Sequence, residues 1–533
     1  MKLGFLPSAS LLTLTLIGYS VAAPARRQDD SCRRTKVAIL GGGMAGVTAA
    51  QALANASVDD FVIVEYLGDL GGRVAHTTFG AQPDGTPYVV ELGANWVQGL
   101  QTDDGPENPI WYLAQKYEIN NTYSDYDSMK TYNETGEVDF LDLLDELDEA
   151  YAILEQNAGH MLSEGLLDYS TRAGLDIAGW KPMKDPKKNV LEWFYFDWEY
   201  SYTPEQSSTL FTIVNYNTTF YQWSEENNFV WDSRGFNTII KGEASVFMNC
   251  TEEYDCSGDS RLLLNTIVTH ISYSDAGVTI TNEDGSCIEA DYAICTFSVG
   301  VFQNDAVSFD PPLPAWKQSA IATFQMGTYT KIFMQFPPDQ VFWNTSVQFF
   351  LYADPVTRGY YPAFQSLDGE GFLPGSGILF VTVVEEESYT VEAQDEETTK
   401  HEILEVLRDM YGAENVPMPT AFMYPRWSLE PWTYGSYSNW PPGTTLEQHQ
   451  NLRANLGRLY FAGEATSAQY YGFLQGAYYE GKEAGEAVAD CLVHPKRCSG
   501  YDRYEVLHGI TQSNEYNTMN GWMVTSFQTN GLE

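Results

Sequence analysis

A strand, a glycine cluster, a helix and a second strand follow one another near the N-terminus, and this order constrains the fold more than any other feature. "TKVAIL" (35–40) is apolar and strand-like, and an alanine-rich, helix-favouring stretch follows the glycines. Gly41, Gly43 and Gly46 have the spacing of the dinucleotide-binding fingerprint, which needs a tight turn, close approach to a pyrophosphate and close helix–strand packing. The sequence therefore predicts an α/β domain that holds a diphosphate at a helix N-terminus.

The segment after this helix completes the motif. "DFVIVE" (60–65) is a second apolar strand, and its last residue, Glu65, comes roughly twenty positions after the glycines, where a carboxylate can accept hydrogen bonds from ribose hydroxyls. A glycine-rich turn in an unrelated α/β protein is the alternative interpretation. The complete order of strand, glycines, helix, strand and acid favours dinucleotide binding.

The rest of the chain does not continue as a simple series of parallel β-α-β units. Residues 139–162 are helix-like, residues 261–299 alternate like paired strands around the turn "EDG", and "GRLYFAGEA" (457–465) again predicts a buried strand before a helix. We therefore predict an α/β fold in which a Rossmann-like domain is assembled from separated segments and a mixed α+β domain is inserted between them. The expected boundaries are 36–105, 236–305 and 425–498 for the first domain, and 106–235 and 306–424 for the second.

The first 23 residues have the layout of a secretory signal peptide. Lys2 precedes an apolar stretch containing "LLTLTLIG", and the small residues "SVAA" follow. We therefore expect residues 1–23 to be removed and the protein to be secreted and extracellular. No other uninterrupted apolar run reaches the length of about 18 residues that a membrane-spanning helix needs, so no membrane span is expected. Residues 499–533 form a C-terminal extension whose role the sequence does not indicate.

The charge balance limits the partners. Lys+Arg 29 against Asp+Glu 72 gives a formal net charge of −43, which argues against nucleic acid and anionic membranes and favours attraction of a cationic partner. The alternative is that the acidity only keeps the protein soluble. A hydrophobic content of 44% excludes a disordered chain. The oligomeric state is not determined by the sequence.

Cysteines and glycosylation motifs agree with passage through an oxidising compartment. Among the 7 cysteines, Cys250 with Cys256 and Cys491 with Cys498 are the expected disulfides, and the odd count leaves at least one thiol free. Their spacings match no zinc site, and no metal site is expected. Sequons of the form N-x-[ST] begin at Asn55, Asn120, Asn133, Asn217, Asn249 and Asn344.

One lysine in an otherwise apolar strand calls for an explanation. In "GTYTKIFMQF" (327–336), alternation places Tyr329, Lys331 and Phe333 on one face of a β-strand. Burial is costly for an ammonium group and pushes a lysine toward neutrality, which makes it a usable proton acceptor. The alternative is an edge-strand lysine whose stem lies along the strand while its amino group reaches solvent.

Several motifs together resemble the flavin-dependent amine oxidases, most closely the secreted polyamine oxidases known from plants. The resemblance runs from about residue 36 to residue 498, and the shared order is more specific than any single motif. The motifs are "LGGRV" (70–74), "VELGANWVQG" (90–99), "FDWEY" (196–200), "FDPPLPAWK" (309–317), "YTKIF" (329–333), "SNWPPG" (438–443), "YFAGEATS" (460–467) and "YYGFLQGAYYEG" (470–481). The resemblance implies that FAD lies extended in the first domain, with its isoalloxazine facing a tunnel in the second.

The resemblance also implies the contacts to FAD. Arg73 offers a guanidinium to the diphosphate, Glu464 is a second acid, and the backbone of Val268 meets the adenine end. By pattern alone, these residues are a surface-turn arginine, a helix-start residue and a core valine. Ser436 occupies the position where monoamine oxidases carry the cysteine bonded to flavin, so noncovalent FAD is expected. The full set of matched positions is Gly41, Gly43, Gly46, Glu65, Arg73, Gly93, Ala94, Asn95, Trp96, Val268, Glu464, Gly472 and Phe473.

In this family the lysine that matches Lys331 holds a water near the reactive flavin nitrogen and is thought to help the reduced flavin react with dioxygen. Lys331 is therefore the expected catalytic residue. Tyr437 and Phe473 occupy the aromatic cage positions beside the amine, in the reverse order of the plant enzymes; as isolated aromatics, both would be assigned to the core.

The tunnel acids carry the main departure from the family pattern. Plant polyamine oxidases read "GANWVEG", whereas this chain reads "GANWVQG" and has Gln98 at the acid position. Glutamine replaces a charge-assisted contact with a neutral one, so Glu199 is the tunnel acid that remains. The substitution puts the substrate in doubt more than the reaction type.

The expected function is that of an FAD-dependent oxidase of spermine, spermidine or their acetylated derivatives. A hydride passes from the carbon beside the amine nitrogen to flavin, the imine hydrolyses to an aldehyde and a smaller amine, and dioxygen reoxidises the flavin and yields hydrogen peroxide. Because an ammonium nitrogen has no lone pair, activity is expected to rise with pH. An L-amino-acid oxidase is the enzymatic alternative and would need a tunnel arginine; a secreted flavin-fold glycoprotein that only binds ligands is the non-enzymatic one.

Overall fold

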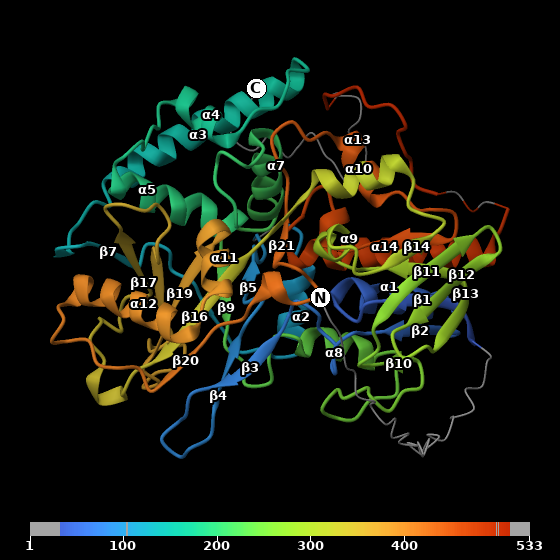
Figure 1. Ribbon diagram of the computed structural model, residues 1–533, viewed down its shortest axis with the longest axis horizontal. Helices are drawn as coiled ribbons and strands as arrows, with labels where there is room; N and C mark the ends of the chain where they lie inside the picture. Colours follow the sequence, from blue (N-terminus) through green and yellow to red (C-terminus); the bar gives the residue numbers. More distant parts are fainter. Residues whose placement is uncertain (1–31, 103–104, 497, 499, 512–533) are drawn as a thin grey trace, which may run out of the picture.

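The computed structural model describes residues 32–102, 105–496, 498 and 500–511, and it contains two large β-sheets (Figure 1). The first sheet lies at the right of Figure 1 and the second at the left, with smaller sheets between them. The expected signal peptide and residues 512–533 lie outside the described residues.

The first sheet has the strand order β10-β2-β1-β13-β12-β11-β14, and β22 also pairs with β13. Its centre is parallel, while β12 pairs antiparallel with β11 and with β13. The pairing of β12 with β13 is the one that the "EDG" turn predicts. The strands are β1 (Arg33–Leu40), β2 (Phe61–Val64), β10 (Leu262–Leu263), β11 (Val268–Ser274), β12 (Gly277–Asn282), β13 (Cys287–Cys295), β14 (Ser308–Asp310) and β22 (Leu459–Phe461). These segments, far apart in sequence, confirm the predicted α/β fold class.

Helices α1 (Met44–Asn55) and α14 (Leu474–Val493) are far apart in sequence and pack against each other beside this sheet. A Cβ atom added to Gly481 would lie 2.1 Å from the carbonyl oxygen of Ala45, and one added to Gly485 would lie 2.4 Å from that of Ala49. Glycine therefore allows the two helices to approach closely, which ties the C-terminal part of the chain to the glycine-rich turn.

The second sheet has the strand order β20-β16-β19-β18-β17-β7-β8. The strand that carries Lys331, β16, is an interior strand, because it pairs antiparallel with both β19 and β20. The strands are β7 (Met129–Asn133), β8 (Gly136–Glu137), β16 (Tyr329–Gln335), β17 (Phe349–Ala353), β18 (Ala363–Ser366), β19 (Ile378–Val384) and β20 (Ala421–Met423).

Smaller elements connect the two sheets. The short strands form the pairs β3 (His76–Phe79) with β4 (Tyr88–Glu91) and β15 (Gln325–Gly327) with β21 (Tyr437–Asn439), and a third sheet of β5 (Trp96–Gln98), β9 (Asn227–Val230) and β6 (Asn121–Tyr123). The remaining helices are α2 (Pro109–Lys116), α3 (Leu143–Ser163), α4 (Thr171–Ala178), α5 (Pro186–Glu192), the π-helix η1 (Trp193–Asp197), α6 (Trp198–Tyr200), α7 (Thr209–Phe220), α8 (Thr238–Ser245), α9 (Val299–Gln303), α10 (Ala315–Thr323), η2 (Pro338–Gln340), α11 (Glu385–Ala393), α12 (Glu396–Tyr411), η3 (Trp427–Leu429), α13 (Leu446–Arg453) and η4 (Glu464–Thr466).

The structure differs from two of the expected domain boundaries. Strand β14 pairs with β11 in the first sheet, although residues from 306 onward were expected in the second domain. Ile110 and Leu113 of α2 join the hydrophobic core that packs α1 and α14, although residues from 106 onward were also expected there. Both differences come from pairing and packing between segments far apart in sequence, which the sequence does not show.

Both predicted short-range disulfides are present, Cys250–Cys256 and Cys491–Cys498. A third, Cys32–Cys287, joins the starts of the adjacent strands β1 and β13 and was not predicted, because its cysteines lie 255 residues apart in sequence. Cys295 is the free thiol among the described cysteines, and it is buried.

The described part of the C-terminal extension, residues 500–511, runs against α13. The amide of Tyr504 donates to Asn451, and the amide of Leu446 donates to the hydroxyl of Thr511. This described part of the extension therefore packs against α13. In the part of the chain that the structure describes, no helix is both long and apolar enough to cross a bilayer.

Candidate active site

The N-terminus of α1 forms an open cradle. Gly41 has φ +114°, which glycine adopts without strain. A Cβ atom on Gly46 would lie 1.9 Å from the carbonyl oxygen of Gly41, so the turn and helix can meet only through glycine. Gly43 precedes α1, and no side chain caps the first amides of this helix. These amides and the positive end of the helix dipole are available to a diphosphate, so the cradle fits an extended FAD.

Two further residues expected at the nucleoside end line the same cavity, Glu65 after β2 and Val268 at the start of β11. The Glu65 carboxylate accepts hydrogen bonds from the amides of Gly42 at 2.5 Å and Leu67 at 2.8 Å. Burial raises the pKa of Glu65, and these two amides oppose the increase. Because each carboxylate oxygen has two acceptor positions, Glu65 can also accept from ribose hydroxyls.

A cavity of about 570 Å³ connects the cradle with the second sheet. This volume lies within the range of about 300–1,000 Å³ that is usual for small-molecule sites. Most of the predicted site residues line it, namely Gly41, Gly43, Glu65, Arg73, Gly93, Ala94, Asn95, Trp96, Gln98, Glu199, Val268, Tyr437, Glu464, Gly472 and Phe473. Two predicted residues, Gly46 and Lys331, are not among the lining residues.

An ion pair fixes the arginine that was predicted to meet the diphosphate. Nη1 of Arg73 donates to Oε1 of Glu464 and to the carbonyl oxygen of Ser436, both at 2.9 Å. Oε2 of Glu464 accepts from the hydroxyl of Ser438 at 2.6 Å and from the amide of Gly472 at 2.8 Å. Glu464 therefore links Arg73, β21 and the segment before α14. Its predicted contact with FAD stays a prediction.

Lys331 lies one layer behind the cavity wall. Its side chain is buried, with 0% of the residue exposed, and Nζ donates to the carbonyl oxygen of Gly93 at 2.9 Å and to Oδ1 of Asn95 at 2.7 Å. Gly93 and Asn95 both line the cavity. The alternative of an edge-strand lysine with its amino group in solvent is wrong, because β16 is an interior strand and the amino group is buried.

A carboxyl group that the sequence analysis missed lies near this lysine. Glu91 ends β4 and is 3% exposed; Oε1 accepts from the amide of Phe236 at 2.7 Å, and Oε2 makes no hydrogen bond with the described residues. Burial lowers the pKa of Lys331, and the charge of Glu91 opposes this decrease. Burial likewise raises the pKa of Glu91. The two groups are therefore electrostatically coupled.

Gln98 and Glu199 meet at the far wall of the cavity. Nε2 of Gln98 lies 3.1 Å from Oε1 and 3.3 Å from Oε2 of Glu199, so the amide donates to the carboxylate. Burial raises the pKa of Glu199 to about 7, and this hydrogen bond opposes the increase. The Gln98 amide therefore holds the Glu199 carboxylate in place, and their predicted role as the tunnel residues stays a prediction.

The predicted cage aromatics come from two elements. Tyr437 begins β21, and its hydroxyl donates to the carbonyl oxygen of Glu199 at 2.9 Å. Phe473 precedes α14, is 6% exposed and packs edge-on against Phe220 with 6.1 Å between ring centroids. Gly472 has φ +80°, and a Cβ atom there would lie 3.3 Å from the Tyr437 ring. The glycine therefore lets both rings reach the cavity, and their role as a cage stays a prediction.

Other aromatic side chains of the wall were missed. Tyr329 lines the cavity, and its place on the same strand face as Lys331 is a signal that could have identified it. Tyr126 also lines the cavity; it stacks on Phe349 at 5.4 Å and meets Trp198 edge-on at 5.6 Å. Tyr126 lies in a connecting segment, where no periodic pattern marks its direction.

Comparison with known proteins shows the family of the chain. The family described as "Flavin containing amine oxidoreductase" matches residues 44–489. Polyamine oxidase 1 of Zea mays is 36% identical over 498 residues, which cover 91% of this chain and 96% of that protein. Polyamine oxidase 7 of Oryza sativa subsp. japonica is 37% identical over 470 residues, 84% of this chain and 93% of that protein.

Solved structures extend the likeness to the fold. A wild-type putrescine oxidase bound to putrescine superimposes with a TM-score of 0.66 at 18% identity, covering 86% of this chain and 99% of that one. The match confirms the predicted architecture, and the glycine cradle fits the cofactor that the family requires. The chain therefore belongs to the family of flavin-containing amine oxidoreductases and is an enzyme that uses FAD.

Proposed function

We propose that this amine oxidoreductase acts on polyamines such as spermine, spermidine or their acetylated derivatives. The Glu199 carboxylate carries the proposal, because it lies in a cavity walled by Trp198, Tyr329 and Tyr437 that is continuous with the FAD cradle. A carboxylate can bind an ammonium group, and ring faces favour an amine nitrogen. The similarity to the maize and rice polyamine oxidases supports the same substrate class.

The residues of the chain bind and orient the amine and exclude water. FAD, held by the glycine cradle, would supply the redox chemistry: oxidation of the carbon beside the amine nitrogen, with dioxygen as the final electron acceptor and hydrogen peroxide as the product. Glu199 holds an ammonium group of the substrate away from the reacting carbon, and the aromatic rings hold the reacting nitrogen. The amino group of Lys331, one layer behind the cavity wall and in contact with Gly93 and Asn95, is the group of the chain that accepts or returns a proton.

An L-amino-acid oxidase is less well supported. It needs a free guanidinium for the substrate carboxylate, and among the described residues that line the cavity the only arginine is Arg73. Arg73 is already paired with Glu464 in the part of the cavity that fits FAD. A protein that only binds ligands is also disfavoured, since the family is one of enzymes.

The proposed function is tested by peroxide release from spermine, spermidine, N1-acetylspermine and phenylalanine. We expect turnover of at least one polyamine and none of phenylalanine. With spermidine, formation of propane-1,3-diamine or of putrescine distinguishes which carbon beside the secondary nitrogen is oxidised. Turnover of phenylalanine alone would contradict the proposal.

FAD is expected to be bound without a covalent link. The hydroxyl of Ser436 accepts a hydrogen bond from the amide of Tyr329 at 2.9 Å, and no cysteine is among the described residues that line the cavity. Acid precipitation of the yellow protein should therefore release all flavin absorbance into the supernatant. Flavin that stays in the pellet would contradict this prediction.

We further propose that the protein is secreted and glycosylated. The N-terminal signal pattern and the three disulfides support passage through an oxidising compartment. Among the sequon asparagines, Asn217 is 4% exposed inside α7 and Asn133 is partly exposed, whereas the exposed ones are Asn55, Asn120, Asn249 and Asn344.

Mass spectrometry of protein secreted from a eukaryotic host tests this assignment. Glycans are expected at exposed asparagines and not at Asn217, because a glycan there would require α7 to leave its packing. Retention of the protein inside the cell would contradict secretion, and an occupied Asn217 would contradict the assignment of sites.

A further inference from the structure

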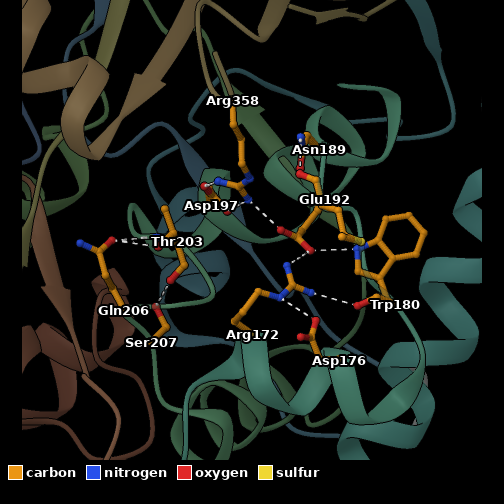
Figure 2. A network of polar contacts seen from close by, with 11 residues as sticks. Arg172, Asp176, Trp180, Asn189, Glu192, Asp197, Thr203, Gln206, Ser207 and Arg358 are labelled. Carbon is orange, nitrogen blue, oxygen red and sulfur yellow. Dashed lines mark hydrogen bonds and ion pairs between the residues drawn. The ribbon is translucent and has the colours of Figure 1, made fainter. Parts of the chain in front are cut away.

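A chain of alternating charges links Arg172, Glu192, Arg358 and Asp197 at the segment that precedes Glu199 in sequence (Figure 2). Arg358, from the connection between β17 and β18, forms two hydrogen bonds to Asp197, one of them at 2.7 Å, and a third to Oε1 of Glu192 at 3.0 Å. The side chains of Asp197 and Glu192 are 2% and 1% exposed. A single guanidinium therefore joins two buried carboxylates.

A second arginine holds the other side of Glu192. Oε2 of Glu192 accepts from Nη1 of Arg172 at 2.5 Å and from the indole of Trp180 at 2.8 Å. Arg172 belongs to α4 and also donates to Asp176 at 3.2 Å (Figure 2). The network therefore ties the segment that begins at Glu192 both to a helix on one side and to the second sheet on the other.

The two carboxylates that Arg358 bridges flank the π-helix η1. Glu192 precedes Trp193, Asp197 ends the π-helix, and the amide of Trp198 donates to the carbonyl oxygen of Trp193, five residues back. In an α-helix, residues five positions apart point about 140° away from each other around the axis. In a π-helical turn they are one turn apart, so both carboxylates can face the same guanidinium.

The residues immediately after the π-helix form the cavity wall. Trp198 and Glu199 follow Asp197 and line the cavity, and Trp198 stacks on Phe194 of the π-helix with 4.7 Å between ring centroids. An α-helical turn instead of the π-helical one would rotate the following residues by about one residue's step, roughly 100°. Glu199 would then no longer point where Gln98 meets it.

We propose that Arg358 is a positioning residue: by bridging Glu192 and Asp197 it holds the π-helical turn, and the turn directs Trp198 and Glu199 into the cavity. The role in substrate binding rests on the proposed function, because it assigns Glu199 to a substrate ammonium. Arg358 itself touches neither the cavity nor, on this account, the substrate, and it acts only through the segment that it holds.

The test compares Arg358→Met and Arg358→Lys with the wild type. For spermidine, Arg358→Met is expected to raise KM about tenfold and to change kcat less than about threefold, since a lost binding contact appears mainly in KM. Lysine keeps the charge but lacks the planar fork, so the KM of Arg358→Lys should lie between that of the wild type and that of Arg358→Met. Arg408→Met is the matched control, because Arg408 pairs with Glu405 on the exposed face of α12, and its KM should equal that of the wild type.

A double variant separates positioning from general destabilisation. If Arg358 acts through Glu199, then Arg358→Met combined with Glu199→Gln should raise KM no further than Glu199→Gln alone. The proposal would be overturned if the increases in KM of the two single variants multiplied in the double variant. It would also be overturned if Arg358→Met had the KM of the wild type.

Amide hydrogen exchange of peptides covering residues 193–200 gives a readout that needs no turnover. Exchange should be faster in Arg358→Met and intermediate in Arg358→Lys, whereas Arg408→Met should match the wild type. Unchanged exchange in both Arg358 variants would overturn the proposal. If the wild type oxidises no polyamine, the proposed function fails, while the exchange measurement still decides whether Arg358 holds the π-helical turn.

Discussion

Replacing Lys331 with methionine is expected to lower kcat for polyamine oxidation about 100- to 10,000-fold, the usual contribution of a positioned proton-transfer group. Methionine fills much of the same space but can neither donate hydrogen bonds to Gly93 and Asn95 nor exchange a proton. Steady-state peroxide release measures the loss. The flavin absorbance of the purified variant shows whether the cofactor is still bound.

Glu91 supplies the matched control for this substitution. Removing the lysine alone leaves a buried carboxyl without the opposite charge that now acts on it, which is destabilising in itself. The variant Lys331→Met/Glu91→Gln removes both charges, so it should recover thermal stability without recovering kcat. Recovery of kcat in the double variant would mean that Lys331 has only a structural role.

The local part of this site could be predicted from sequence. The glycine cradle and Glu65 follow from a short, ordered pattern, because a strand, a turn and a helix that are adjacent in sequence must also be adjacent in space. Period-two alternation fixes the faces of a strand and so singled out Lys331 as an unusual lysine, while its expected role came from the family resemblance. Neither inference needs to know where the rest of the chain lies.

Contacts between distant segments could not be predicted. Nothing in "VELGAN" shows that Glu91 lies near the amino group of Lys331, because the two residues reach each other from different sheets. The disulfide Cys32–Cys287 depends on the pairing of β1 with β13, which only the folded chain reveals. Arg358 lies in a connecting segment without periodicity, so its two carboxylate partners had no sequence signal.

Gln98 and Glu199 are an intermediate case, in which part of the site was predicted from sequence and part was not. Their motifs identified Gln98 and Glu199 and the missing charge, but not that the glutamine amide donates to the remaining carboxylate. Nor could sequence predict that burial raises the pKa of Glu199 to about 7, because burial depends on packing from several elements. Both facts determine how the enzyme should respond to pH.

Replacing Glu199 with glutamine is expected to raise KM for spermidine roughly 10- to 100-fold, because a hydrogen bond to a charged group contributes about 1.5–3 kcal/mol. In the wild type the carboxylate forms as pH rises through about 7, so KM should fall between pH 6 and pH 8. The variant lacks this carboxyl group and should lose the part of the pH dependence of KM that Glu199 contributes. A variant with the wild-type KM at pH 8 would contradict the assignment of Glu199.

The exchange variant Gln98→Glu/Glu199→Gln is the matched control, because it keeps one carboxylate and one amide at the same wall. It should recover part of the affinity that Glu199→Gln loses.

Ionisation of Glu199 is expected to improve substrate binding but to lower the stability of the folded protein. The pKa of Glu199 is higher in the folded protein, about 7, than its ordinary value of 4.5, so the folded state holds this proton more tightly. The contribution to stability is therefore fully present below pH 4.5 and is lost as pH rises through about 7. The melting temperature of the wild type minus that of Glu199→Gln should therefore be lower at pH 8 than at pH 5. Added spermidine should reduce this difference, because an ammonium group beside Glu199 offsets the cost of burying its charge.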